Sequence, residues 1–203
     1  MPPIENDTHL IDVLRSGVVV ALPTDTVFGL CARANNDAAV DRIYTIKQRD
    51  PQQPMPIFAA DLAQAETIGV IDGDARTLAH AFWPGALTIV VPVRPGYRSR
   101  ALAGSDTVAL RVPADERLRR LCADVGPLTG TSANIAGREE CRTAAEVRAQ
   151  LGDAGPPGVD LIVDAPVAAT GQPSTIVDCT QSPPQILRPG AVSEREIRAA
   201  LRR

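Results

Sequence analysis

The sequence contains few aromatic side chains and no excess of positive charge. Aromatic residues make up 3% of the 203 residues, so few rings are available on which the bases of single-stranded nucleic acid could stack. Lysine and arginine number 21 against 24 aspartate and glutamate residues, whereas dedicated nucleic-acid-binding proteins are usually basic overall. This composition argues against a dedicated nucleic-acid-binding protein but leaves room for a local basic cleft.

Motifs for metal binding and for nucleophilic catalysis are also missing. The four cysteines are widely spaced, with no CxxC pair and no cluster with the two histidines. We therefore expect reduced thiols, with neither a zinc site nor a disulfide framework. The sequence has no P-loop, GxGxxG, HExxH or GxSxG motif, which argues against a zinc enzyme and against a hydrolase with a Ser-His-Asp triad.

Segments that could target or span a membrane are absent from the sequence as well. The first 17 residues lack a basic stretch followed by an apolar one, and no apolar run is long enough to cross a bilayer. We therefore expect a cytoplasmic protein without a membrane partner.

The sequence does contain short apolar runs that alternate with segments of helical periodicity. Runs typical of buried strands lie at residues 18–22, 56–60, 86–91, 108–112, 161–163, 174–177 and 185–187. Helices are predicted over residues 7–16, 37–46, 62–68, 74–82, 115–124, 143–151 and 193–201. Thr143 with Glu146, and Ser193 with Glu196, have the spacing of capping boxes. The alternation predicts one α/β domain over residues 1–203, with a single twisted, mostly parallel or mixed sheet flanked by helices.

Hydroxyl groups and glycines gather at two places. In PTDTVFGL, from Pro23, Thr24 and Thr26 alternate at the carboxyl end of an apolar run, which is where ligands bind to α/β sheets. In PLTGTSANIAG, from Pro127, small residues suit the close approach of phosphate or carboxylate oxygens to backbone N–H groups. Ordinary turns, whose hydroxyls bond to the local backbone, explain both segments as well.

Cations stand at two further places. Lys47 and Arg49 lie just before Pro51, which ends the preceding helix, although cations at such an end also simply favour the helix dipole. In the expected strand at 107–112, the two-residue period places Thr107 and Arg111 on one face, about 13 Å apart at roughly 3.3 Å per residue. These two side chains could line a cleft, or the arginine could lie on a solvated face of the sheet.

In this order along the chain, the segments resemble the YrdC-type threonylcarbamoyl-AMP synthase family. The resemblance covers about residues 17–192 and is carried by GVVVALPTDTVFGL from Gly17, the KxR of Lys47 and Arg49, WPGALT from Trp83, VALRVP from Val108, PLTGTSAN from Pro127, PSTIVD from Pro173 and ILRPG from Ile186. No single piece is decisive, but seven collinear pieces together are specific.

The resemblance implies a YrdC/RibB-like fold with a concave, locally positive cleft. It also implies the synthesis of threonylcarbamoyl-AMP and pyrophosphate from L-threonine, bicarbonate and ATP, for the threonylcarbamoyladenosine modification of tRNA. The residues that the resemblance assigns to threonine binding are Thr26, Arg111 and Ser174. Those that it assigns to ATP binding are Lys47, Arg49, Thr107, Ser132, Asn134 and Arg188, with Lys47 and Arg49 also catalytic.

The charges of the substrates fit this assignment. A carbamate that attacks the α-phosphate brings negative groups together, and arginines and a lysine offset their repulsion. Mg²⁺ is expected with ATP, although no residue is predicted to be a metal ligand. The implied protein partners are the transferases that pass the group to tRNA, and direct contact with tRNA or other RNA is left open. Because the chain ends shortly after ILRPG, it resembles the short form of the family.

One wall of the expected cleft departs from the family pattern. Family members often have KxRPxxNPL, followed three residues later by a histidine on the threonine side. This sequence has KQRDPQQPMPIF, with Gln53 for the asparagine and Phe58 for the histidine. Substrate recognition at this wall is therefore expected to differ.

Two other functions remain as alternatives. The first is an RNA-binding or ribosome-associated paralogue without synthase activity, against which the net charge of −3 argues. The second is another carbamoyl-transferring enzyme, because related domains occur in hydrogenase-maturation and antibiotic-carbamoylating proteins. Those domains usually belong to chains longer than 203 residues.

Overall fold

The computed structural model describes residues 7–155, 158–165 and 172–202. The helices are α1 (Asp7–Arg15), α2 (Asp37–Lys47), α3 (Leu62–Glu66), α4 (Gly73–Phe82), the 3₁₀ turn η1 (Arg100–Leu102), α5 (Glu116–Val125), α6 (Ala144–Leu151) and α7 (Glu194–Leu201). The strands are β1 (Val20–Pro23), β2 (Phe28–Cys31), β3 (Ile57–Phe58), β4 (Leu87–Pro92), β5 (Thr107–Arg111), β6 (Leu128–Thr129), β7 (Thr131–Ser132), β8 (Leu161–Ile162), β9 (Thr175–Asp178) and β10 (Gln185–Arg188). No helix within these ranges has the length and hydropathy needed to cross a bilayer.

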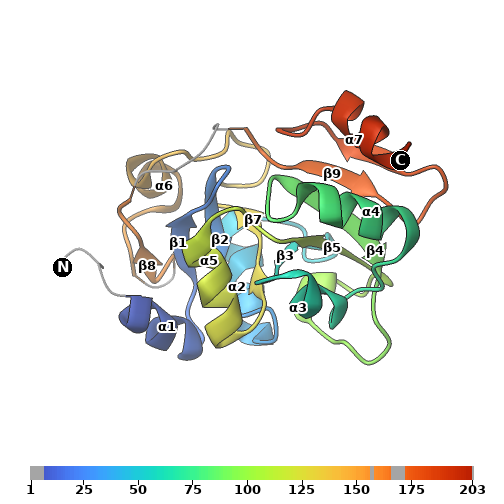
Figure 1. The fold of residues 1–203 in the computed structure, drawn as a ribbon. Helices are drawn as coiled ribbons and strands as arrows, with labels where there is room; N and C mark the ends of the chain where they lie inside the picture. The colour runs from blue at the N-terminus through green and yellow to red at the C-terminus, as the bar shows by residue number, and fades with distance from the viewer. Residues whose placement is uncertain (1–6, 156–157, 166–171, 203) are drawn as a thin grey trace.

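The strands form two hydrogen-bonded sheets that lie on opposite sides of the molecule in Figure 1. One sheet has the order β7-β2-β1-β8, and helix α6 packs on its β1 and β8 strands. The other has the order β10-β9-β4-β5-β3-β6, and helix α4 packs between its strand β4 and helix α7. Both sheets are mixed, because antiparallel pairs such as β1–β2 and β4–β5 stand beside parallel pairs such as β1–β8 and β4–β9.

The α/β class, the flanking helices and the mixed strand pairing are confirmed, but the strands form two sheets where a single sheet was expected. The reason lies in the segment around Gly130. Leu128 pairs with β3 of the six-stranded sheet, whereas Thr131 pairs with β2 of the four-stranded sheet. The chain therefore changes sheets within three residues. A β-carbon on Gly130 would lie 2.9 Å from the ring of Phe58, so a side chain at this crossing would clash with the ring.

Local sequence explains the ends of several helices. The two capping boxes are present: the side chains of Thr143 and Ser193 accept from the backbone N–H groups of Glu146 and Glu196, which bond back. Helix α2 ends at Lys47, and Gln48 follows in the left-handed region with φ of 51°. This turn directs the chain after α2 toward the crossing at Gly130.

Lys47 is a buried side chain that joins helix α2 to the crossing segment. It is 2% exposed, and its ammonium group donates to the carbonyl oxygens of Ser132 and Asn134, the latter at 2.8 Å. A third, longer contact of 3.4 Å reaches Oδ1 of Asn134. The backbone carbonyl of Lys47 in turn accepts from the N–H of Ala136 at 2.8 Å. Lys47 therefore fixes residues 132–136 against the end of α2.

We expect the substitution Lys47→Met to lower the free energy of unfolding by about 2 kcal/mol, because it leaves buried carbonyl oxygens without a donor. Chemical denaturation monitored by circular dichroism measures this loss. The matched control is Arg120→Met, which replaces an exposed cation on α5 and should change stability by less than about 0.5 kcal/mol. Equal effects of the two substitutions would contradict the role of Lys47 in the fold.

The pKa of Lys47 provides a second test. Burial, and then the neighbouring charge of Arg49, lower this pKa to about 8. Because Lys47 is the only lysine in the sequence, NMR of protein labelled with ¹⁵N-lysine reports its titration without overlap. Above pH 8 the unfolded chain keeps its lysine proton longer than the folded protein, so stability relative to Lys47→Met should rise by up to about 1.4 kcal/mol per pH unit until about pH 10. A measured pKa above 10 would overturn this prediction.

Candidate active site

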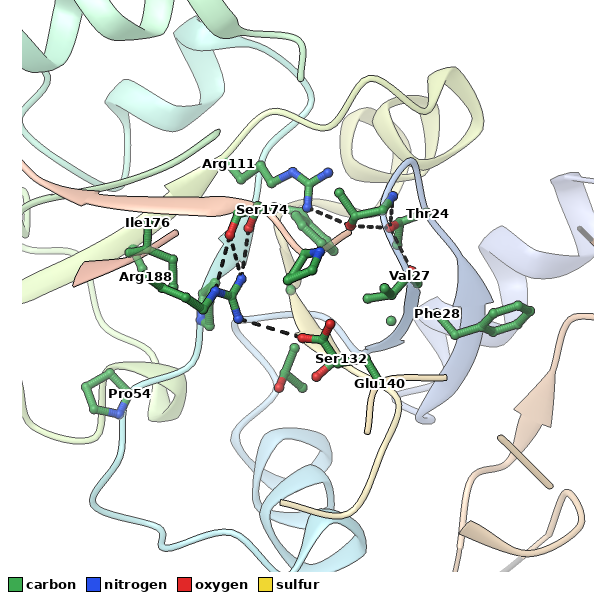
Figure 2. A pocket seen from close by; sticks show the side chains of 18 of the residues that line it. Thr24, Val27, Phe28, Pro54, Arg111, Ser132, Glu140, Ser174, Ile176 and Arg188 are labelled. Atoms are coloured by element: carbon green, nitrogen blue, oxygen red, sulfur yellow. Dashed lines mark hydrogen bonds and ion pairs between the residues drawn. The ribbon is translucent and has the colours of Figure 1, made fainter. Parts of the chain in front are cut away.

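A pocket of about 290 Å³ lies between the two sheets, next to the crossing at Gly130. Its residues come from the turn between β1 and β2, from strands β2, β3, β4, β5, β7, β9 and β10, from the segment after α2, and from the loops that contain Glu140 and Pro173. Figure 2 shows this pocket with polar side chains from several of these elements around one space. Its size falls at the lower end of the range for small-molecule sites.

Arg111 is the most strongly held cation of the pocket. Its Nε donates to the carbonyl of Gly85 at 2.9 Å, Nη1 donates to the hydroxyl of Thr26 at 3.0 Å, and Nη2 pairs with the carboxylate of Asp25 at 2.6 Å. The second oxygen of Asp25 accepts from the N–H of Ala114 at 3.0 Å. A guanidinium has five N–H groups, so two of those on Arg111 remain for a ligand.

The surroundings of Arg111 are apolar on one side and anionic on the other. The ring of Phe58 lies 5.6 Å from the guanidinium carbon, within the range of a cation–π contact. Arg111 is 3% exposed, and this burial lowers its pKa while the carboxylate of Asp25 opposes the shift. An arginine keeps its charge under such conditions, so the site presents a fixed, partly compensated positive charge.

The hydroxyls of Thr24 and Thr26 form a chain whose proton directions follow from the acceptors. The hydroxyl of Thr24 donates to the carbonyl of Val27 at 2.8 Å and accepts from the N–H of Thr26. Because a hydroxyl carries one proton, the 3.0 Å contact between the two hydroxyls has Thr26 as donor. The hydroxyl of Thr26 therefore accepts from Arg111 and keeps acceptor capacity toward the pocket.

Ser174 and Arg188 form a second polar group. The hydroxyl of Ser174 lies 2.8 Å from that of Thr88, and Nη2 of Arg188 donates to the carbonyl of Ser174 at 2.8 Å. Figure 2 shows the guanidinium of Arg188 between Ser174 and Glu140, and its Nη1 lies 3.8 Å from the carboxylate of Glu140. Burial lowers the pKa of Arg188, and Glu140 opposes this shift.

Arg49 contributes a third cation from the segment after α2. Its Nη2 donates to the carbonyl of Pro54 at 2.8 Å, which holds the loop of residues 49–54 in place. Its Nε is buried, and no acceptor for it is present among the described residues. Burial lowers the pKa of Arg49. A ligand that enters the pocket therefore meets three guanidinium groups held by protein acceptors.

The structure brings six of the predicted site residues together and leaves three outside the pocket lining. The six are Thr26, Arg49, Arg111, Ser132, Ser174 and Arg188. Lys47 and Asn134 lie behind the lining, where they position Ser132. Thr107 shares a strand face with Arg111 but lies at the opposite end of β5, and its hydroxyl bonds to that of Ser105 at 3.0 Å.

Asp25 and Glu140 were not identified from the sequence. Asp25 stands between two threonines, and its position in PTDT is the one signal that could have marked it. Glu140 lies in a stretch that contains alternating cations and acids and carries no comparable signal. Asp25 orients Arg111, and Glu140 faces Arg188.

The donors of the pocket fit a magnesium ion that is carried in by phosphate groups. Among the described residues, no group of three or more metal-binding side chains comes together, and Glu140 is the one carboxylate among the lining residues. Mg²⁺ commonly binds through one or two carboxylates together with substrate phosphates and water. Glu140 is therefore the residue that could contribute to holding it.

Comparison with known sequences identifies a family that this chain matches. Residues 12–190 match the profile of the Sua5/YciO/YrdC family, which carries the description "telomere recombination". A protein of Bacillus subtilis named threonylcarbamoyl-AMP synthase is 38% identical over 192 residues, which cover 93% of this chain and 54% of that protein. The synthase of Idiomarina loihiensis is 38% identical over 81% of this chain and 88% of its own length. That of Vibrio vulnificus is 34% identical over 92% of this chain and its own full length.

Solved structures give the same result. Sua5 of Pyrococcus abyssi, crystallised with L-threonine, superimposes with a TM-score of 0.88 at 34% identity and covers 96% of this chain and 57% of that one. YciO of Escherichia coli shares the fold, with a TM-score of 0.81 at 24% identity. The chain thus spans about half the length of the Bacillus and Pyrococcus relatives and most or all of the shorter ones. The sequence match and the shared architecture place this chain in the Sua5/YciO/YrdC family.

Proposed function

We propose that this protein is an L-threonylcarbamoyladenylate synthase, a nucleotidyltransferase that uses L-threonine, bicarbonate and ATP. The observation that carries the proposal is the arrangement of Arg111, Asp25 and Thr26, which holds a guanidinium rigidly in the pocket with two N–H groups left for a ligand. A guanidinium with two unused N–H groups suits a carboxylate. The names of the relatives and the threonine complex of Sua5 support the same substrate.

We assign the binding of the amino-acid substrate to Arg111, Thr26 and Ser174. In this proposal Arg111 binds the carboxylate of threonine, and the hydroxyls of Thr26 and Ser174 hold its polar groups. The amine of threonine attacks the carbon of bicarbonate, and loss of water gives a carbamate. Because these side chains are already fixed by protein contacts, binding requires little further ordering and favours reaction through positioning.

We assign the binding of the nucleotide to Arg49, Ser132 and Arg188. An oxygen of the carbamate attacks the α-phosphate of ATP, the bond to the β-phosphate breaks, and pyrophosphate leaves with the displaced electron pair. Arg49 and Arg188 offset the negative charge that gathers at the α-phosphate, and Ser132 donates a hydrogen bond. Glu140 would help to hold Mg²⁺ brought in with the phosphates, and the ion would supply further charge neutralisation.

The proposal also states in which domain and compartment the reaction takes place and which kind of enzyme uses its product. We place the whole site in one domain formed by residues 1–203 and assign the protein to the cytoplasm. The carbamate–phosphate anhydride is a reactive product, so a transferase must accept the threonylcarbamoyl group promptly and pass it to tRNA.

The central test of the proposal is release of pyrophosphate from ATP by the purified protein. We expect release when L-threonine and bicarbonate are both present and loss of release when either is omitted, because the carbamate needs both. A coupled pyrophosphatase assay measures the rate, and mass spectrometry identifies the adenylate. Release that does not depend on threonine would refute the proposed function.

A second test concerns Asp25. The substitution Asp25→Asn removes the charge that offsets the burial of Arg111 and loosens its orientation, so we expect the KM for threonine to rise about tenfold with a smaller change in kcat. The control is Asp124→Asn, which removes the same charge from an exposed position on α5. An unchanged KM for threonine in the folded Asp25 variant would show that Asp25 does not position Arg111 for binding.

A further inference from the structure

The ring of Phe58 lies against the guanidinium of Arg111 because the two residues are level on neighbouring strands. Phe58 on β3 pairs with Arg111 on β5 in parallel register, and the N–H of Ala59 donates to the carbonyl of Arg111 at 2.9 Å. The guanidinium carbon lies over the ring, 5.6 Å from its centroid. The register of the six-stranded sheet therefore sets this contact.

Gly130 leaves space for the ring on the other side of β3. It follows β6, which pairs with β3 on the side opposite to β5. A β-carbon at Gly130 would lie 2.9 Å from Cε1 and 3.0 Å from Cδ1 and Cζ of Phe58, so a side chain there would displace the ring. Phe58 is 3% exposed and yet lines the pocket. The ring is thus confined between the crossing of the two sheets and Arg111.

The ring stabilises the charge of Arg111 without cancelling it. Burial, which Asp25 opposes, lowers the pKa of Arg111, and the charge of Arg188 lowers it further. Asp25 already matches the single positive charge of Arg111. A second carboxylate at this place would make the group anionic and repel an anionic ligand. An aromatic face attracts a cation but carries no net charge, so it supports the guanidinium and leaves it able to bind a carboxylate.

We propose that Phe58 is a positioning residue for the amino-acid substrate and that it acts through Arg111. The inference rests on the proposed binding of L-threonine by this arginine. The ring holds the guanidinium and keeps water from it, so the substrate carboxylate meets a fixed cation with little hydration. Exclusion of water strengthens the attraction between opposite charges. Phe58 therefore affects binding of the amino acid and not of the nucleotide, whose phosphates are assigned to Arg49 and Arg188.

Calorimetric titration measures this effect without turnover. Phe58→Leu keeps an apolar side chain but removes the aromatic face, so we expect the Kd for L-threonine to rise about fivefold. The Kd for ATP with Mg²⁺ should stay unchanged. Phe82→Leu is the matched control, because Phe82 is a partly buried ring on α4 that is not among the residues lining the pocket. Its loss should leave the affinity for L-threonine as it is in the wild-type protein.

A trifluorinated phenylalanine at position 58 separates the electrostatic role of the ring from its packing. Fluorine atoms on the rim withdraw electron density from the face, which weakens the attraction for a cation while the shape of the side chain is nearly kept. We expect the Kd for L-threonine to rise about threefold, with the midpoint of chemical unfolding nearly unchanged. The same fluorinated residue at position 82 should change neither quantity.

The leucine and the fluorinated variants together decide the outcome. Unchanged affinity for L-threonine in both would overturn the proposal. A loss in Phe58→Leu without a loss in the fluorinated protein would also overturn it, because Phe58 would then act through packing alone. Equal weakening of L-threonine and ATP would contradict a role that is confined to Arg111. Absence of L-threonine binding to the wild-type protein would refute the proposed function itself, whereas binding that does not respond to the ring would refute this inference alone.

Discussion

The ammonium group of Lys47 holds together the two pieces of chain from which the pocket is built. Its hydrogen bonds to the carbonyls of Ser132 and Asn134 fix the strand that has just crossed from one sheet to the other. Ser132 can line the pocket only if that strand stays paired with β2. Burying the ammonium group of a lysine among uncharged groups is costly, and this cost is offset when each of its protons has an acceptor. The ammonium group of Lys47 has three acceptor contacts. Lys47 is thus a structural support of the site before it is anything else.

The pocket itself is built from cations that the protein has already partly neutralised. Arg111 is paired with Asp25 at 2.6 Å, and Arg188 lies 3.8 Å from Glu140. A buried guanidinium without such a partner would be costly, so the acids make it feasible to keep several arginines close together without a ligand. The two ion pairs differ in how firmly their carboxylates are held. Asp25 is also tied to the backbone at Ala114 and stays in place, whereas the longer contact of Glu140 is one that a phosphate group can replace.

Much of the fold could be predicted from the sequence because it depends on local patterns. The seven expected helices and seven apolar strands are present, since periodicity and capping residues act within a few positions of each other. Strands β6 and β7 were missed because two residues each are too short to show a pattern, and β2 was missed because its first residues belong to the hydroxyl-rich segment PTDTVFGL that follows β1. The division into two sheets was missed as well, because it depends on the short strands β6 and β7, between which the chain crosses from one sheet to the other at Gly130.

The candidate site was predictable in its cations and hydroxyls but not in how they are held. A lysine in the last turn of a helix is usually exposed, and nothing local to Lys47 indicates that its ammonium group meets carbonyls 85 and 87 positions away. The role of Asp25 depends on Arg111, 86 positions further along. Leu187 faces the pocket because of a bulge, which a strict two-residue period excludes. These features arise from contacts between distant segments and become visible only in three dimensions.

The one lysine among the 21 lysine and arginine residues stands where the acceptors suit an ammonium group. A guanidinium is planar and suits paired acceptors, such as the carboxylate of Asp25 or the two oxygens of Ser174 that Arg188 contacts. The ammonium group is compact and directs its protons to three sides, which suits acceptors gathered from successive residues of a turning backbone. At position 47 the acceptors are two carbonyls and one amide oxygen from residues 132 and 134. An arginine would have to place a larger, planar group at a position that is 2% exposed, so burial favours lysine on shape as well as on charge.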